Sequence, residues 1–494
     1  MSEVTAQGRS GGASFDWLNP ILVREVQQAV NGRVFQLTIW VALIASVVIA
    51  SVAGSEGVNV ASGRSAFEAG LVTLTPLLLF VIPMQAYSSM RTELKGGVVE
   101  QVLMSRLGPG RVISGKLQAA MVQFVLYVSL LMPLLATSYL LRGVDLPTIG
   151  VSLFFALAAC ATATVFAISS AAQGVIPSLQ PIANLGMAFG LGVATLGTMG
   201  AIGSGAYHQL VAMMLRDGDA TLAMSAITLG AGVTATMSWL TARSYLLHAF
   251  EDKSSAFRAF LWLLPLLVYG WMFCFVARGD WRELFILLTL GLLLAGLAFG
   301  VFMVTEQRDL SPRVRSHVPA SVMAAVVCSP LLPGRDRGSL CYAVYSAVIS
   351  GIAYAFWPRE DDRLGLISAA AQVGVMIVAY GLLYLCAGRW LRGRLPETVQ
   401  GSQAGRVALP LLLFACIVVP LLVDGLSHGY VSAWHLGHVL NPFWTTAYVV
   451  DEGRWDAAQP WVLAAIGVVL AAQLPGWIRG VREVLRASAA RRSR

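Results

Sequence analysis

Residues 284–305 read LFILLTLGLLLAGLAFGVFMVT, a run in which no side chain is charged. A helix needs about 20 mostly apolar residues to cross the hydrocarbon core of a bilayer. The run is long enough for this, and it lacks the polar face that a helix on the surface of a soluble protein carries. The stretch therefore predicts a membrane-spanning helix.

Eleven further stretches of this kind occur along the chain: 34–53, 70–90, 117–141, 148–172, 182–202, 220–242, 259–277, 341–357, 364–388, 407–423 and 461–478. The whole chain of 494 residues is 57% hydrophobic and only 12% charged, whereas soluble domains carry about 25% charged residues. The sequence predicts an all-α polytopic membrane protein with about twelve transmembrane helices. Because 341–357 and 407–423 are short, ten is the lower bound.

The basic residues predict the orientation. None of the 34 Lys and Arg residues lies inside a predicted span, and 26 of them fall on the side that holds both termini. Such an excess of basic residues marks the cytoplasmic side. We expect cytoplasmic termini and a location in the bacterial cytoplasmic (inner) membrane. The basic residues lie at helix ends beside the bilayer, so the partners they indicate are membrane lipids and not nucleic acid.

The spans divide the chain into three parts. Residues 1–33 form a cytoplasmic N-terminus, 34–253 a half with six spans, and 254–494 a second half with six spans. An independent soluble domain needs roughly 50 residues, and no segment between spans is that long. We therefore expect no catalytic domain outside the membrane, and the chain is not predicted to be an enzyme.

The N-terminal part contains a predicted amphipathic helix over 15–33. Leu22, Val26 and Ala29 share one face, and Arg24 and Gln27 lie opposite. This pattern is typical of a helix that lies in the membrane interface. The alternative is an ordinary surface helix.

The loop 91–116 between the second and third spans is the most informative segment. Its residues Val98, Val99, Val102 and Leu103 give one apolar helical face, and the turn at 108–110 ends the helix. A short amphipathic helix held between two spans can transmit force from a soluble partner. The alternative is a solvated connecting loop.

Two motifs resemble ligand sites, and we interpret neither as one. Residues 110–116 match the first seven positions of a phosphate-binding loop, but Leu117 replaces the Ser or Thr that coordinates Mg²⁺. We expect no nucleotide site on this chain. His435 and His438 have a spacing that allows metal ligation, but a solvated loop is the favoured interpretation and we predict no metal site.

Three short motifs carry a family resemblance: Asn19-Pro20-x-x-x-x-Glu25, Glu93-x-x-x-Gly97-x-x-Glu100 and Gly115-Lys116. Together with six spans they make residues 16–253 similar to the permease subunit of a type-2 ABC exporter. The chain departs from the family at Val98, where these loops often carry Thr, and at Arg106, where they often carry Pro.

The resemblance implies that loop 91–116 contains a coupling helix, which docks on a separate ABC ATPase subunit. ATP and Mg²⁺ would then bind to that partner, and this chain would hold no cofactor. The coupling residues that the resemblance implies are Glu93, Gly97, Val99, Glu100, Val102 and Leu103. We expect Val99, Val102 and Leu103 to face the ATPase and Glu100 to make a polar contact with it.

The second half contains a segment whose sequence is similar to part of this loop. Residues 329–335 share the pattern Ser-x-Leu-x-Pro-Gly-Arg with residues 105–111. Internal duplication is common in transporters, so we predict a diverged repeat with a second coupling loop at Pro333, Gly334 and Arg335. Chance similarity of two turn-rich segments is the alternative, in which case the chain would pair with a second permease chain.

The number of charged residues at membrane depth helps to distinguish a secondary transporter from the other classes of function. A secondary transporter coupled to protons usually needs ionisable residues at membrane depth, whereas here only Asp424 touches a predicted span, at its end. This pattern favours an exporter subunit driven by an external ATPase. A membrane scaffold without transport activity stays open, with a secondary transporter as the weaker alternative.

Overall fold

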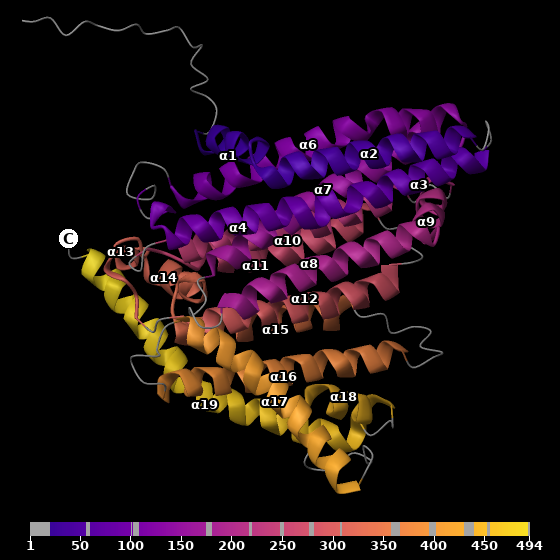
Figure 1. Cartoon of the computed structure of the whole chain (residues 1–494). Coiled ribbons are helices and arrows are strands. Elements are labelled where there is room, and N and C mark those ends of the chain that lie inside the picture. The colour runs from indigo at the N-terminus through magenta and orange to yellow at the C-terminus, as the bar shows by residue number, and fades with distance from the viewer. Residues whose placement is uncertain are drawn as a thin grey trace, which may run out of the picture. The chain divides into compact units, whose positions relative to one another are not determined.

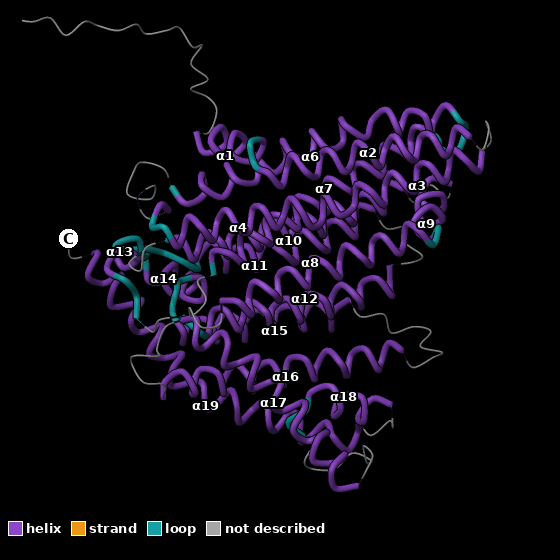
Figure 2. Tube along the Cα trace, in the orientation of Figure 1, coloured by secondary structure: helices purple, strands orange, loops and turns teal. Residues whose placement is uncertain are grey.

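The computed structural model describes residues 20–55, 60–99, 101, 108–173, 180–216, 220–247, 251–275, 281–306, 309–356, 366–394, 402–428, 439–451 and 455–492. The chain divides into two compact units, Met1–Leu246 (unit 1) and Leu247–Arg494 (unit 2). Their boundary lies seven residues before the division predicted at 253. Within the described ranges the regular elements are helices and no strand occurs (Figure 2).

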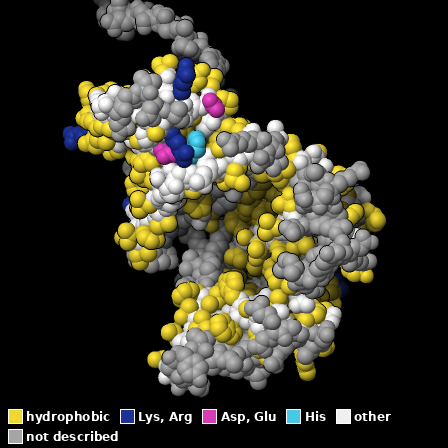
Figure 3. All heavy atoms as spheres, turned by 90° about the vertical axis from the view of Figure 1, so that its right-hand side faces the viewer, with side chains coloured by type: hydrophobic (Ala, Val, Ile, Leu, Met, Phe, Trp, Pro, Cys, Tyr) yellow, Lys and Arg dark blue, Asp and Glu magenta, His cyan; other side chains and the backbone are white. Residues whose placement is uncertain are grey.

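Among the described residues, eleven helices are long and apolar enough to cross a membrane. Each corresponds to a span predicted from the sequence. The remaining predicted span, 407–423, lies in helix α17 (Ser402–His428), whose described apolar part Leu412–Asp424 is shorter than a span requires. Hydrophobic side chains prevail on the face drawn in Figure 3, where charged ones are few. The chain is an all-α polytopic membrane protein.

The described part of unit 1 begins with the short helix α1 (Pro20–Val30), which lies within the predicted segment 15–33, and residues 15–19 of that segment lie outside the described residues. Six long helices follow: α2 (Arg33–Ser55), the continuous α3–η1–α4 (Val60–Pro76, Leu77–Val81, Ile82–Lys95), α6 (Pro109–Leu140), α7 (Leu146–Ala172), α8 (Gln180–Gly203) and α10 (Ala220–Leu246). A short helix, α9 (Ala206–Arg216), precedes α10. The long helices run side by side in Figure 1.

The second long helix of unit 1 contains one wide turn, η1. There the N–H of Ile82 donates to the carbonyl of Leu77, five residues earlier. Pro83 follows directly and has no N–H to donate to an earlier carbonyl. The proline explains why the regular α-helical pattern gives way to a π-turn at this position.

Unit 2 also contains six long helices: α11 (Ser255–Phe275), α12 (Trp281–Val304), α15 (Arg335–Phe356), α16 (Leu366–Arg394), α17 and α19 (Trp455–Arg492). Short elements α13 (Pro312–Arg315), α14 (Val322–Cys328) and η3 (Ser329–Leu331) lie between the second and third long helices. The short helix α18 (Pro442–Asp451) precedes α19.

Glycines on α12 allow close packing in unit 2. A Cβ atom at Gly296 would lie 2.6 Å from the ring of Tyr345, and one at Gly300 would lie 2.6 Å from Leu385. Because these glycines are four residues apart, they form one small-residue face on the helix. That face lets α15 and α16 approach the α12 backbone, as small residues do in membrane helix pairs.

The long helices have the same neighbours in both units. In each unit, the second long helix packs against the first, third, fourth and fifth. The fourth also packs against the third, fifth and sixth, and the third against the first and sixth. Even the short helices α9 and α18 correspond, since each contacts the fourth and sixth long helices of its unit.

Candidate functional site

A buried lysine joins three elements of unit 1. The side chain of Lys116, in the second turn of α6, is only 1% exposed. Its ammonium group lies 2.6 Å from Glu25 Oε1 and 2.9 Å from Glu93 Oε2, and it donates to Ser89 Oγ at 2.7 Å. An ammonium group has three N–H donors, so these contacts use all of them.

Arginine completes this group of side chains. Arg24 forms an ion pair with Glu93, and its guanidinium lies 3.7 Å from Glu25. Ser89 Oγ in turn donates to the second oxygen of Glu25 at 3.0 Å. Two cations and two carboxylates therefore balance, which is how charges are retained in a low-dielectric environment. We call Arg24, Glu25, Ser89, Glu93 and Lys116 the first cluster.

The first cluster links the two helices that flank the predicted coupling loop. Glu93 lies in the last turn of α4, Lys116 near the start of α6, and Glu25 on α1, which packs on α6. The helices α4 and α6 extend further than predicted, so the linker between them shortens from 91–116 to 96–108. A displacement of this linker would therefore act on three helices at once.

The structure places three of the six predicted coupling residues. Glu93 belongs to the first cluster. Gly97 has φ of +68°, a left-handed conformation that glycine adopts without steric cost, and it separates α4 from the next helical turn. Val99 is 2% exposed and packs in the core of unit 1, so its side chain faces inward and not toward a partner. Glu100, Val102 and Leu103 lie outside the described residues.

A cavity of about 810 Å³ opens beside the first cluster. Arg24, Glu25, Glu93 and Lys116 line it together with apolar residues from the start of α2 and from α6. It lies at the end of unit 1 that carries the linker 96–108. No pattern in the sequence predicted this cavity.

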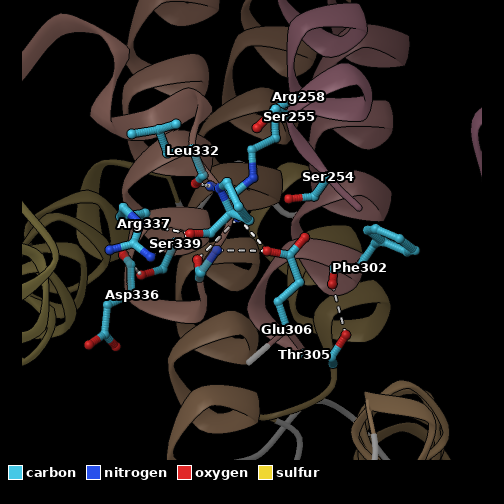
Figure 4. A network of polar contacts seen from close by, with 12 residues as sticks. Ser254, Ser255, Arg258, Phe302, Thr305, Glu306, Leu332, Asp336, Arg337 and Ser339 are labelled. Carbon is cyan, nitrogen blue, oxygen red and sulfur yellow. Dashed lines mark hydrogen bonds and ion pairs between the residues drawn. The ribbon is translucent and has the colours of Figure 1, made fainter. Parts of the chain in front are cut away.

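Unit 2 contains a second group of buried charges, among them Arg258, Glu306 and Arg337, which Figure 4 shows close together. Arg258, in the first turn of α11, has a fully buried side chain. Its guanidinium donates to Glu306 Oε2 at 2.8 Å, just after α12, and to the carbonyls of Pro330, Leu332 and Gly334. One arginine therefore holds the loop 330–334 in place.

A second arginine secures the same loop from the other side. Arg337, on the first turn of α15, donates from Nε to the carbonyl of Pro333 at 2.8 Å and from Nη1 to Glu483 Oε2 at 2.8 Å. Glu483, on α19, also accepts from the N–H of Leu310 at 2.9 Å. We call Arg258, Glu306, Arg337, Glu483 and the carbonyls of 330–334 the second cluster.

These contacts fix the predicted second coupling loop in unit 2, with Gly334 buried and Pro333 and Arg335 partly exposed. The carbonyl of Pro333 accepts from Arg337, and Gly334 is buried, with its N–H donating to Glu306 at 2.8 Å. Arg335 begins α15, and its side chain is 16% exposed. The polar backbone of this turn is occupied within the unit, which leaves little of Pro333, Gly334 or Arg335 for a partner.

The exposed segment of this region is α14. Its apolar side chains Val322, Met323, Val326 and Val327 are 46%, 77%, 43% and 72% exposed. On the opposite face, Ala325 is buried in a small core that also contains Val484 of α19. Residues 322–327 are all apolar in the sequence, and only packing shows which of them are exposed.

The comparisons with known proteins leave the family open: no protein-family model, no curated protein and no solved structure matches the chain. Among the described residues, no group of three His, Cys, Asp or Glu side chains is arranged to hold a metal ion. His435 and His438 lie outside those residues. The class that the structure defines is a polytopic helical membrane protein with two charge clusters, one joining α1, the end of α4 and the start of α6, and the other joining the start of α11, the end of α12, the start of α15 and α19.

Proposed function

We propose that the chain is the membrane-spanning permease of an ABC exporter in a bacterial inner membrane, driven by ATP hydrolysis on a separate ATPase subunit. The observation that supports this proposal most directly is the first cluster. Its residues Glu25, Glu93 and Lys116 come from the three separate motifs on which the family resemblance rests, and they contact one another. Motifs that meet in space support a common role better than motifs scattered along a chain.

The contacts of the first cluster also suit a coupling device. A docked ATPase would push or pull on the linker 96–108, and Glu93 and Lys116 stand at its two ends. Buried, charge-balanced contacts resist such a load because separating them would leave charges unpaired in a low-dielectric environment. The load would then pass to α1, α4 and α6.

The matched neighbours of the long helices support an internal duplication. In this proposal one chain supplies both halves of the permease, with twelve spans and both termini in the cytoplasm. The helix α14 would then be the docking surface of unit 2, because it lies between the second and third long helices, as the linker 96–108 does in unit 1. Pairing with a second permease chain is the runner-up arrangement.

A membrane scaffold without transport activity is the alternative function, and a secondary transporter is the weaker one. The exposed apolar face of α14 does not distinguish the exporter from the scaffold, since a scaffold would also use this face to bind a soluble partner. Only the identity of the bound partner separates the exporter from the scaffold.

The test is to purify the tagged chain in mild detergent and identify the proteins that remain bound with and without ATP. We expect an ABC ATPase with the wild type and its loss with Glu100→Lys and with Met323→Glu. The matched control is Glu251→Lys, which changes an acidic residue in the segment before α11, where Glu251 pairs with exposed Arg313. If the wild type retains no such ATPase under any nucleotide condition, the proposal is wrong and the scaffold is preferred.

A further inference from the structure

The cavity beside the first cluster has a lining of two chemically different kinds. Charged side chains line it, among them Arg24, Arg33 and Lys116. Apolar side chains also line it, including Phe35 and Ala120. Its volume of about 810 Å³ lies within the range of pockets that hold a small amphiphilic molecule.

The charges that line the cavity leave one cation in excess. Lys116 is balanced by Glu25 and Glu93, and Arg24 also pairs with Glu93. Arg33, the first residue of α2, is exposed and forms no ion pair with an acidic residue among those described. Arg33 could therefore form an ion pair with an anionic group that enters the cavity.

The lining of the cavity also contains an unsatisfied polar group. Gln123 is 6% exposed and lines the cavity, and its Oε1 atom has no hydrogen-bond partner among the described residues. It lies seven residues beyond Lys116 on α6, which is about 10 Å deeper along the helix axis. An unpaired polar group in an apolar environment is costly, so this amide indicates a polar ligand group at that depth.

We propose that the cavity binds an anionic glycerophospholipid, with the phosphate at Arg33, the glycerol region at Gln123 and the acyl chains leaving past the apolar wall. A soluble phosphate ester would satisfy Arg33, but it has no acyl chain to cover the apolar lining. Basic pockets between transmembrane helices at the membrane surface are known to take lipid headgroups. This inference is independent of the transport proposal, since a scaffold would hold the same site.

The test is native mass spectrometry of the purified full-length chain exchanged into equal amounts of phosphatidylglycerol and phosphatidylcholine. We expect wild type to retain phosphatidylglycerol over phosphatidylcholine by several fold. Arg33→Gln and Gln123→Leu should each reduce the retained phosphatidylglycerol at least threefold. Glycerol 3-phosphate at millimolar concentration should not displace it.

Two matched controls separate this site from general surface binding. Arg243→Gln removes an arginine from the end of α10, away from the cavity lining, and Gln118→Leu changes an exposed glutamine on α6. Both should bind phosphatidylglycerol as the wild type does. Equal losses in the controls, no preference in the wild type, or displacement by glycerol 3-phosphate would each overturn the proposal. Because Arg33 is exposed, its variant should fold normally, which an unchanged elution profile would verify.

Discussion

The first and second clusters each join the second and third long helices of their unit, but they hold the chain in different ways. In unit 1, Lys116 contacts carboxylate and hydroxyl side chains, and a cavity opens beside it. In unit 2, Arg258 is fully buried and binds three backbone carbonyls in addition to Glu306. The first cluster therefore joins helices to one another, whereas the second mainly fixes the shape of one loop.

This difference has an energetic consequence. A carboxylate beside a cavity can regain water or an alternative partner when its cation is removed, and Glu93 also has Arg24. A carbonyl inside a packed loop has no such substitute. We expect the second cluster to contribute more to stability than the first.

The largest effect is expected for Arg258→Met. The methionine fills a similar volume but leaves Glu306 and the carbonyls of the loop 330–334 without their cationic partner. The expected loss is about 3 to 5 kcal/mol of unfolding free energy, measured by thermal unfolding of the purified chain through tryptophan fluorescence. Arg313→Met is the control, because its ion pair with Glu251 is exposed and worth less than about 1 kcal/mol. Equal shifts for the two variants would contradict the role of Arg258.

A smaller loss, of about 2 to 3 kcal/mol, is expected for Lys116→Met. Glu25 and Glu93 lose their lysine, but Arg24 and water in the cavity compensate in part. The double variant Lys116→Met/Glu93→Gln should recover some of the loss, because one of the two stranded carboxylates is neutralised. The same unfolding assay measures all three proteins. If Lys116→Met costs as much as Arg258→Met, the two clusters do not differ as the geometry indicates.

The smallest effects are expected at the two glycines with positive φ that flank these clusters. Gly334→Ala should cost about 1 to 3 kcal/mol, since φ is +137° and the new Cβ would meet the guanidinium of Arg337 at 2.2 Å. Gly97→Ala should cost less, about 1 to 2 kcal/mol, because nothing lies within 4 Å of its Cβ position. Unfolding midpoints in the same detergent would check this order. A larger loss at Gly97 would show that the linker is packed more tightly than the loop 330–334.

The sequence alone determined the class of fold. Whether a segment spans a bilayer depends on about 20 consecutive residues. Composition therefore predicted twelve spans, and eleven of them coincide with the candidate membrane helices among the described residues. The amphipathic pattern of α1 was likewise a local property, whereas the end of α4 at Lys95 was not predicted, because the sequence indicated a helix over 93–108. The spans and the pattern of α1 could be predicted because the physical cause and the residues that carry it lie in the same stretch of chain.

Only the tertiary structure decided which polar residues are buried and with which partners. Glu25 is a charged residue of a short helix, yet it is 8% exposed because its partner Lys116, 91 residues later in the chain, lies against it. In the same way, the turn at Pro333 and Gly334 has the composition of an exposed loop, but Gly334 is buried and Arg258 and Arg337 bind the carbonyls of the turn. Burial of a charge depends on long-range pairing, and no local pattern of residues records it.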